Sequence, residues 1–321
     1  MLRPLSRRRF IAISAAAAGC ALTPVGAKAS AMPEAVTWRG QALGAQASLI
    51  IHHHDRGVAE RLVRDVVAEV ERLEQVFSLY RADSSLSQLN RAGALAAPPR
   101  DLIALLDASR EVWKLSAGAF DPTVQPLWRL LAEHFSRAEA APGGPSPATL
   151  REALALVGFE GVAFNPDRIT FARRGMALTL NGIAQGYITD RAVEVLRRGG
   201  MEKSMVDMGE IAALGTRPDG TPWRVGIEEA SGSAGIAATL EIVDRAVATS
   251  SAGGFRFDDA GRFTHLFDPR SGVSPRLYRS VTVIAPDATS ADAFSTACSL
   301  LQPDAIKRIA ARRNLDVHTA S

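Results

Sequence analysis

The sequence predicts an α+β fold, and three observations support this prediction. Helical and β-rich stretches are mixed along the chain without the strict alternation of a doubly wound parallel sheet. The β-rich stretches between residues 222 and 269 follow one another directly, as antiparallel strands do. The chain has 321 residues and a hydrophobic content of 47%, which is enough for one large domain or two closely packed ones.

The first 29 residues predict an export signal that is not part of the fold. Arg7–Arg9 precede an apolar stretch over residues 10–22, which is shorter than the roughly 20 residues that a membrane span needs. Small residues at 27–29 offer a cleavage site. We therefore expect a cleaved twin-arginine-type signal peptide over residues 1–29 and the folded domain over residues 33–321.

Two alternatives stay open for this segment. An ordinary secretory signal can also have an arginine-rich start. Cys20, in the stretch AAGC, weakly resembles a lipoprotein attachment site, so a lipid anchor there is the second alternative. All three interpretations place the protein outside the cytoplasmic membrane, and we expect a periplasmic location.

The charge balance argues against a nucleic-acid partner. Residues 1–29 carry five of the 37 basic residues and no acidic ones, so the rest of the chain has 32 bases against 34 acids. The basic character of the full sequence is thus a property of the export signal. After cleavage only Cys298 remains, so no intramolecular disulfide can form.

The first half of the domain predicts a hairpin followed by helices. Residues 36–53 alternate in polarity and are β-rich, which predicts a strand and a hairpin. Apolar residues at helical spacing predict an amphipathic helix over 58–78. A loop with a short helical turn follows over 79–93, and a second helix ends near Gly118. The Pro-, Gly- and Ala-rich stretch 136–150 predicts a surface connection.

The second half mixes strands and helices. In chain order we expect strands within 169–182, a helix over 186–200, a strand over 204–215, antiparallel strands over 222–229 and 235–251, a hairpin over 253–269 that turns at 258–261, a strand over 279–286, and helices over 290–301 and 303–314.

The helix predicted over 290–301 has an unusual polar face. Asp292, Ser295 and Thr296 lie at positions i, i+3 and i+4, which places them on one side of an otherwise apolar helix. Burying such groups without partners costs a few kcal/mol each. A backbone carbonyl, a neighbouring loop or a hard cation could satisfy them.

Three further stretches are candidates for chemistry. Asp121 in GAFDPTVQPLW precedes a proline after a helix, where it could present a carboxylate or simply cap the next helix. Gly182 and Gly186 in LTLNGIAQGYITD allow a ligand to approach the backbone closely before a helix begins. His265 and Asp268 in THLFDPRSG could move a proton and orient the proton carrier, or close a turn.

Eight stretches taken in order resemble the ApbE family, the FAD:protein FMN transferases. They are SLYRADSSLSQLN, GAFDPTVQPLW, NGIAQGYITDRA, WRVGIEE, VATSS, HLFDPRSG, SVTVIAP and ADAFSTA. The resemblance covers residues 40–302, and it implies one compact domain built from two tandem T-fold-like halves around a central flavin cleft.

The resemblance also implies an activity. Members of the family use Mg²⁺ to split FAD at its pyrophosphate, attach FMN to a threonine of an exported or membrane-anchored redox protein through a phosphoester, and release AMP. The acceptor is expected to carry an Asp/Ser-Gly-x-Thr segment and to be a respiratory membrane-anchored flavoprotein. Two alternatives stay open: a periplasmic FAD pyrophosphatase that yields FMN and AMP, and a non-catalytic protein that binds or delivers flavin.

Position by position, the resemblance assigns roles to named residues. The side chains of Asp292, Ser295 and Thr296 and the carbonyl of Gly182 would hold Mg²⁺. His265 would accept the threonine proton, and Asp268 stays the candidate for orienting the His265 ring. The residues implied to contact FAD are Leu43, Tyr80, Ala119, Phe120, Asp121, Thr179, Gln185 and the neighbourhood of Phe267.

Three of these positions depart from the common pattern of the family. Leu43 replaces the usual methionine, Thr179 replaces an aspartate, and Gln185 replaces a lysine or glutamate. The departures favour the flavin-binding alternative, whereas Asp292, Thr296 and His265 favour catalysis.

Overall fold

The computed structural model describes residues 35–228, 235–275 and 277–321. The predicted signal peptide and Cys20 lie outside these described residues. Within them, no helix is long and apolar enough to cross a membrane.

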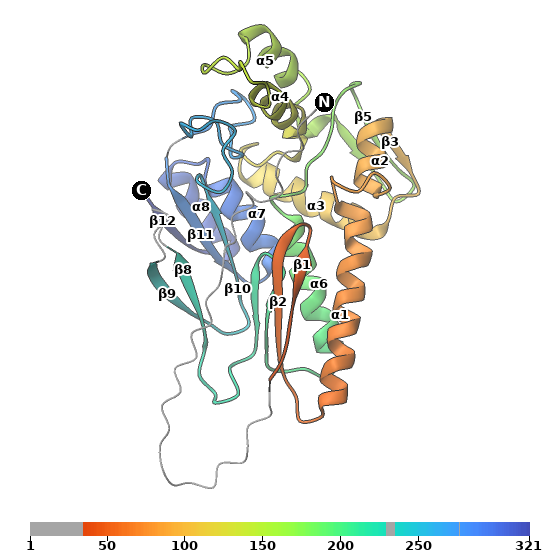
Figure 1. The fold of residues 1–321 in the computed structure, drawn as a ribbon, viewed down its shortest axis with the longest axis vertical. Coiled ribbons are helices and arrows are strands. Elements are labelled where there is room, and N and C mark those ends of the chain that lie inside the picture. The colour runs from red at the N-terminus through yellow and green to blue at the C-terminus, as the bar shows by residue number, and fades with distance from the viewer. Residues whose placement is uncertain (1–34, 229–234, 276) are drawn as a thin grey trace.

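A seven-stranded antiparallel sheet forms the centre of the molecule, which confirms the α+β prediction (Figure 1). Every neighbouring pair of strands in it is antiparallel. In sheet order the strands are β1 (Ala35–Ala42), β2 (Ala45–His52), β6 (Ser204–Asp207), β7 (Ile211–Leu214), β10 (Ala246–Ser251), β11 (Ser280–Ala285) and β12 (Asp316–Ala320). The division into two tandem halves stays a prediction.

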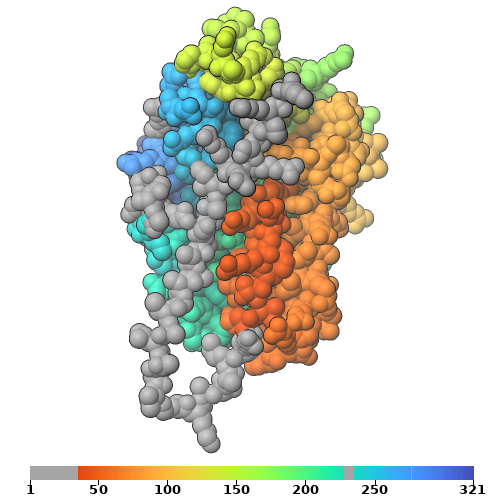
Figure 2. Space-filling model, viewed as in Figure 1, coloured from red at the N-terminus to blue at the C-terminus, as the bar shows by residue number. Residues whose placement is uncertain are grey.

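Three helices cover one face of this sheet: α1 (Arg56–Phe77), α6 (Ala184–Arg198) and α7 (Ala288–Cys298). The prediction for α1 is confirmed, because its apolar side is buried against the sheet and the side chain of Asp55 caps its first turn. Figure 2 shows the β1–β2 hairpin (red-orange) beside α1 (orange) along one flank of the molecule. The main hydrophobic core lies between the sheet and these helices.

The opposite face of the sheet is covered by a hairpin of β8 (Trp223–Glu228) and β9 (Ile236–Ile242). A second apolar cluster joins the hairpin to the sheet and includes Trp223, Met205 and Val247. The central strands are therefore buried on both faces, which explains why they are apolar almost throughout.

The remaining elements form one end of the molecule, where Figure 1 shows α4 and α5. They are α2 (Ser85–Ala92), β3 (Ala94–Ala96), α3 (Arg100–Leu115), a 3₁₀ turn (Pro122–Val124), α4 (Gln125–Phe135), α5 (Pro147–Leu154), a second 3₁₀ turn (Phe159–Gly161), β4 (Val162–Phe164) and β5 (Arg168–Phe171). Helix α8 (Pro303–Arg313) lies instead beside β12 (Figure 1). Strands β3, β5 and β4 form a small antiparallel sheet.

The structure corrects two of the expected strands. Residues 176–180 form no strand, because side-chain atoms of Asn90 bind both backbone groups of Leu178, and the carbonyl of Pro122 accepts the N–H of Thr179. Residues 204–215 form two strands instead of one, since Gly209 turns the chain with a φ of +103°.

Two further expectations hold only in part. The hairpin expected over 253–269 is reduced to one bridge, between Arg256 and Thr264, with its turn at 258–261 as predicted. The end of the connection 136–150 belongs to α5, and the sequence analysis did not predict α4, α5 or β12.

Candidate active site between helices α6 and α7

The polar face of α7 packs against the start of α6. The Asp292 side chain is only 4% exposed, and its Oδ2 accepts a hydrogen bond from the backbone N–H of Gly186 over 3.0 Å. A Cβ atom at Gly186 would lie 2.2 Å from the carbonyl oxygen of Ala288. Glycine is therefore required for α6 to approach α7 this closely.

Hydroxyl groups continue this polar face next to Asp292. Ser250, at the end of β10, lies with its Oγ 2.7 Å from the Ser295 Oγ and 3.3 Å from the Thr296 Oγ1. A Cβ atom at Gly182 would lie 2.9 Å from the same Thr296 hydroxyl, so the backbone of Gly182 faces it directly. The structure thus brings together all four residues predicted as metal ligands.

Buried negative charge surrounds this cluster. Burial raises the pKa of Asp292 to about 7 in spite of the hydrogen bond from Gly186, and repulsion from the neighbouring Asp190 contributes to this rise. Burial also raises the pKa of Glu210, with added repulsion from Asp292 and Asp207. Among the described residues, Asp292 forms no ion pair with a lysine or arginine. A bound cation would offset this unbalanced charge.

The donor set fits a hard divalent cation. One carboxylate, two or three hydroxyls and a backbone carbonyl are oxygen ligands of the kind that Mg²⁺ prefers, and Mg²⁺ usually keeps positions for phosphate and water. In the described part of the chain no group of three or more His, Cys, Asp and Glu side chains could hold a metal. A magnesium site here would therefore depend on Asp292 as its single carboxylate ligand.

His265 lies beside the end of β10. A Cβ atom at Gly254 would be 3.1 Å from the His265 Cε1 and 3.2 Å from the carbonyl oxygen of Ser251. The His265 Nδ1 is 3.2 Å from the N–H nitrogen of Phe255 and 3.3 Å from its carbonyl oxygen. When Nδ1 donates to that carbonyl, Nε2 is free to accept a proton. Burial lowers the pKa of His265, so the ring is unprotonated at neutral pH.

Asp268 has a structural position instead of the predicted orienting one. Its Oδ1 accepts a hydrogen bond from the N–H of Arg270, and its backbone carbonyl accepts one from Gly272. No hydrogen bond joins it to His265 within the described ranges. Asp268 therefore closes a turn, which was the alternative interpretation of this motif.

Two residues implied to contact FAD lie in exposed or half-buried turns. Tyr80 is 63% exposed, so its ring is accessible for stacking on a planar ligand. Leu43 is in the β1–β2 turn with a φ of +48°, and its N–H donates to the Glu74 carboxylate.

Gln185 lies in the first turn of α6, and Thr179 precedes that helix. Gln185 packs over Gly209, where a Cβ atom would lie 2.4 Å from its Nε2. The half-buried Thr179 accepts a hydrogen bond from the N–H of Asn181 through its hydroxyl.

The other implied FAD contacts are buried. Phe120 packs in the main core and Phe267 in a separate apolar cluster with Leu127 and Leu131, and Ala119 is 9% exposed. These side chains pack inside the protein, so a ligand at these positions would contact the backbone instead of the side chains.

Asp121 caps the 3₁₀ turn that follows it. Its Oδ1 accepts hydrogen bonds from the N–H and the hydroxyl of Thr123, and its Oδ2 accepts one from the N–H of Phe159. Both oxygens are thus taken within the chain. The helix-capping alternative for Asp121 describes what the structure shows.

The sequence analysis missed several residues of this site. Ser250 and Asp190 were part of the quoted stretches VATSS and NGIAQGYITDRA but were not singled out. Asp207 and Glu210 were given no role in the site. Glu210 lies in the turn between β6 and β7, and both Glu210 and Asp207 line a pocket of about 30 Å³, which can hold water. Only the packing of separate elements reveals these groups, so no local pattern could have found them.

Comparison with known proteins identifies the class of this chain. A family model described as the ApbE family matches residues 43–319. A protein of Treponema pallidum named FAD:protein FMN transferase is 33% identical over 261 residues, which cover 74% of this chain and 71% of that protein.

Two solved structures resemble the fold. The flavin transferase ApbE from Vibrio cholerae has a TM-score of 0.77 and 25% identity, covering 89% of this chain and 93% of its own. The ApbE protein from Thermotoga maritima has a TM-score of 0.78 and 25% identity, covering 90% and 97%.

These matches make the chain an α+β enzyme of the transferase class. The chain belongs to the ApbE family, because the family model spans most of its length.

Proposed function

We propose that this protein transfers the FMN part of FAD to a side chain of another protein. The names of its relatives support flavin transfer from FAD. The observation that carries the proposal is the cluster of Asp292, Thr296 and Ser250 against the start of α6, in a chain of this family.

The proposed reaction is a phosphoryl transfer onto a threonine of the acceptor. The threonine Oγ forms a bond to the phosphorus of the FMN half of FAD, the pyrophosphate bond to that phosphorus breaks, and AMP leaves. The threonine proton goes to the Nε2 of His265, which its lowered pKa keeps unprotonated at neutral pH. Tyr80 is the candidate for stacking on the flavin ring.

The proposed metal is Mg²⁺, held by Asp292, Thr296, Ser295 and the carbonyl of Gly182. When bound, it would neutralise the charge that builds up on the pyrophosphate oxygens during transfer. The start of α6 presents Gly186, whose N–H holds one oxygen of Asp292 and leaves the other without a hydrogen bond in the described structure.

The partner and the location are part of the same proposal. The expected acceptor is an exported or membrane-anchored redox protein with an Asp/Ser-Gly-x-Thr segment, of the respiratory type. The arginine-rich start and the small residues at 27–29 support export to the periplasm by the twin-arginine route, with Cys20 as an alternative lipid anchor.

The test mixes the purified mature protein with FAD, Mg²⁺ and a tagged acceptor that bears the threonine segment. We expect a fluorescent acceptor band in a denaturing gel and one AMP for each labelled acceptor. The matched control is an acceptor with valine in place of the threonine, which should stay dark. AMP and free FMN without a labelled band would instead identify a hydrolase, and bound but intact FAD would identify a flavin-binding protein.

A further inference from the structure

Asp190 joins helix α6 to the beginning of helix α7. Its Oδ1 accepts a hydrogen bond from the N–H of Ala288 over 2.7 Å. Its Oδ2 accepts two from Thr289, one from the N–H over 2.8 Å and one from the hydroxyl over 2.5 Å. Both oxygens of this α6 carboxylate therefore bind the first turn of α7, where free N–H groups favour negative charge.

The same arrangement occurs in the opposite direction. Asp292 belongs to α7, and its Oδ2 accepts a hydrogen bond from the N–H of Gly186 in the first turn of α6. Each helix thus supplies a carboxylate to the other helix's N-terminus. We call this arrangement the reciprocal clasp, and it consists of Asp190 with Ala288 and Thr289, and of Asp292 with Gly186.

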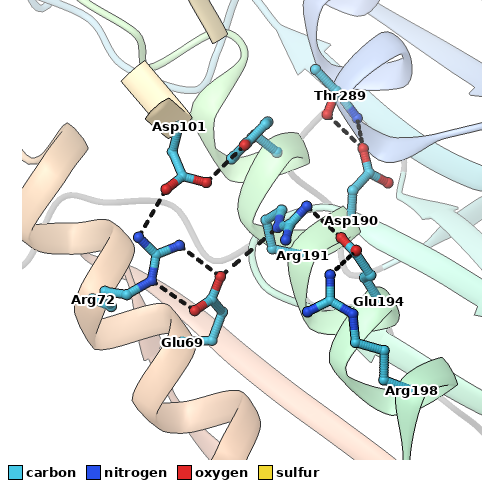
Figure 3. A network of polar contacts seen from close by, with 9 residues as sticks. Glu69, Arg72, Asp101, Asp190, Arg191, Glu194, Arg198 and Thr289 are labelled. Atoms are coloured by element: carbon cyan, nitrogen blue, oxygen red, sulfur yellow. Dashed lines mark hydrogen bonds and ion pairs between the residues drawn. The ribbon is translucent and has the colours of Figure 1, made fainter. Parts of the chain in front are cut away.

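A neighbouring side of α6 is joined to the rest of the protein by charged groups. Arg191 lies 3.8 Å from Glu69 of α1. Glu69 binds Arg72 of the same helix, and Arg72 binds Asp101 of α3 over 2.8 Å. Figure 3 shows Asp190 turned toward Thr289 and Arg191 turned toward Glu69. These contacts hold α6 beside α1 and α3, and the hydrogen bonds of Asp190 hold α7 against α6.

We infer that Asp190 is a positioning residue, whose hydrogen bonds to α7 hold Asp292 and Thr296 in register with the backbone of Gly182. This inference rests on the proposed function, since it concerns the same metal-binding face. The alternative is that Asp190 only stabilises the start of α7.

The chain offers a matched control for that alternative. Asp287 is the N-cap of α7, and its carboxylate accepts hydrogen bonds from the N–H and the hydroxyl of Ser290 over 2.7 and 2.9 Å. It stabilises the same first turn as Asp190 but makes these bonds within its own helix. Replacing Asp287 therefore weakens the helix start without releasing α7 from α6.

The experiment compares Asp190→Ala with Asp287→Ala in the full mature protein with FAD. Two readouts give the Mg²⁺ requirement: the Mg²⁺ concentration for half-maximal transfer rate, and the Mg²⁺ concentration for half of the metal-induced rise in melting temperature. We expect both concentrations to rise at least tenfold in Asp190→Ala and less than twofold in Asp287→Ala. Equal Mg²⁺ requirements in the two variants would overturn the inference, whatever their melting temperatures.

A second pair of variants serves if Asp190→Ala does not fold. Thr289→Val removes one of the three hydrogen bonds to Asp190, and Thr289→Ser restores its hydroxyl. We expect a two- to fivefold rise in the Mg²⁺ requirement for valine and recovery with serine, and an unchanged requirement for valine would overturn the inference. A wild-type protein that transfers no flavin would overturn the proposed function instead, while the melting readout would still decide the role of Asp190.

Discussion

The turn at Asp121 and the junction of α6 with α7 use buried aspartates in different ways. Asp121 is 8% exposed and Asp292 is 4% exposed, and burial raises the pKa of both. The chain uses both oxygens of Asp121, through three donors, whereas Asp292 accepts a single N–H. The number of partners therefore distinguishes a carboxylate that supports the fold from one that can bind a ligand.

The two regions also differ in where the polar groups come from. The donors to Asp121 lie on its own turn and on Phe159, and together they close a local structure. The carboxylate of Asp292 meets α6, and the hydroxyl of Ser295 on the same helix meets Ser250 of β10. A site assembled from several elements can bind a substrate between them, and the predictions below test this contrast.

The largest effect is expected for Asp292→Ala. Flavin transfer should fall by a factor on the order of a thousand, because the single carboxylate among the proposed metal ligands is lost. FAD should still bind, as measured by quenching of its fluorescence. The matched variant Asp292→Asn keeps an oxygen for the N–H of Gly186 but lacks the charge, so it should be about as inactive. Full activity in Asp292→Ala would reject the metal assignment.

A smaller effect is expected for His265→Gln. Loss of the general base should lower kcat by about a hundredfold or more. In the wild type, kcat/KM should fall as the pH drops through the pKa of His265, which burial holds below its usual value of 6.5. This acidic limb should vanish in the variant. The exposed His318 on β12 gives the control His318→Gln, which should keep the wild-type profile, and an acidic limb that survives in His265→Gln would exclude His265 as the base.

For Asp121→Ala we predict a loss of stability. Three donors lose their acceptors, so the free energy of unfolding should fall by about 2–3 kcal/mol. Urea denaturation measures this change. Asp121→Asn, which keeps one acceptor oxygen, should lose less. A loss below about 0.5 kcal/mol for alanine would show that these hydrogen bonds do not hold the turn.

The smallest effect is expected for Asp207→Asn, and it depends on pH. Burial raises the pKa of Asp207 from its usual 3.8 to about 6, so the folded protein binds a proton more tightly than the unfolded chain does. This proton binding stabilises the fold. Its contribution to the free energy of unfolding is fully present below pH 3.8 and is lost as the pH rises through 6. The full shift corresponds to about 3 kcal/mol, and Asp207 is only half-buried, so solvent screening reduces this value. Asparagine should therefore raise the free energy of unfolding at pH 8 by about 1–2 kcal/mol.

The gain from Asp207→Asn should be absent at pH 4, where the wild-type carboxyl is already protonated. Urea denaturation at both pH values checks this difference. An equal gain at the two values would mean that repacking, and not charge, explains the change.

The parts of the fold that follow a simple period were predictable from the sequence. Helix α1 and the β1–β2 hairpin appear where the apolar spacing predicts them. The stretch 176–180 has a strand-like composition, yet Asn90, which lies 88 positions before Leu178, takes its backbone hydrogen bonds. A contact between positions so far apart leaves no trace in local sequence.

The candidate site shows the same limit. The i, i+3, i+4 spacing revealed that Asp292, Ser295 and Thr296 share one side of a helix. It could not reveal that Ser250 faces them or that Asp190 binds the other helix, because both facts depend on how the sheet and the helices pack. The local sequence pattern thus identifies the site residues on one helix, and the tertiary structure is needed to find the residues that face them.

The register between β10 and β11 decides whether Ser250 belongs to the candidate site. Ala248 packs on the helix side of the sheet and Val247 on the other side, so Ser250 faces α7 only in the observed register. The hydroxyls of Thr249 and Thr282 bind across the two strands and fix that register. A shift by one residue would turn Ser250 away from α7, so an error in the pairing of these two strands would also disrupt the candidate site.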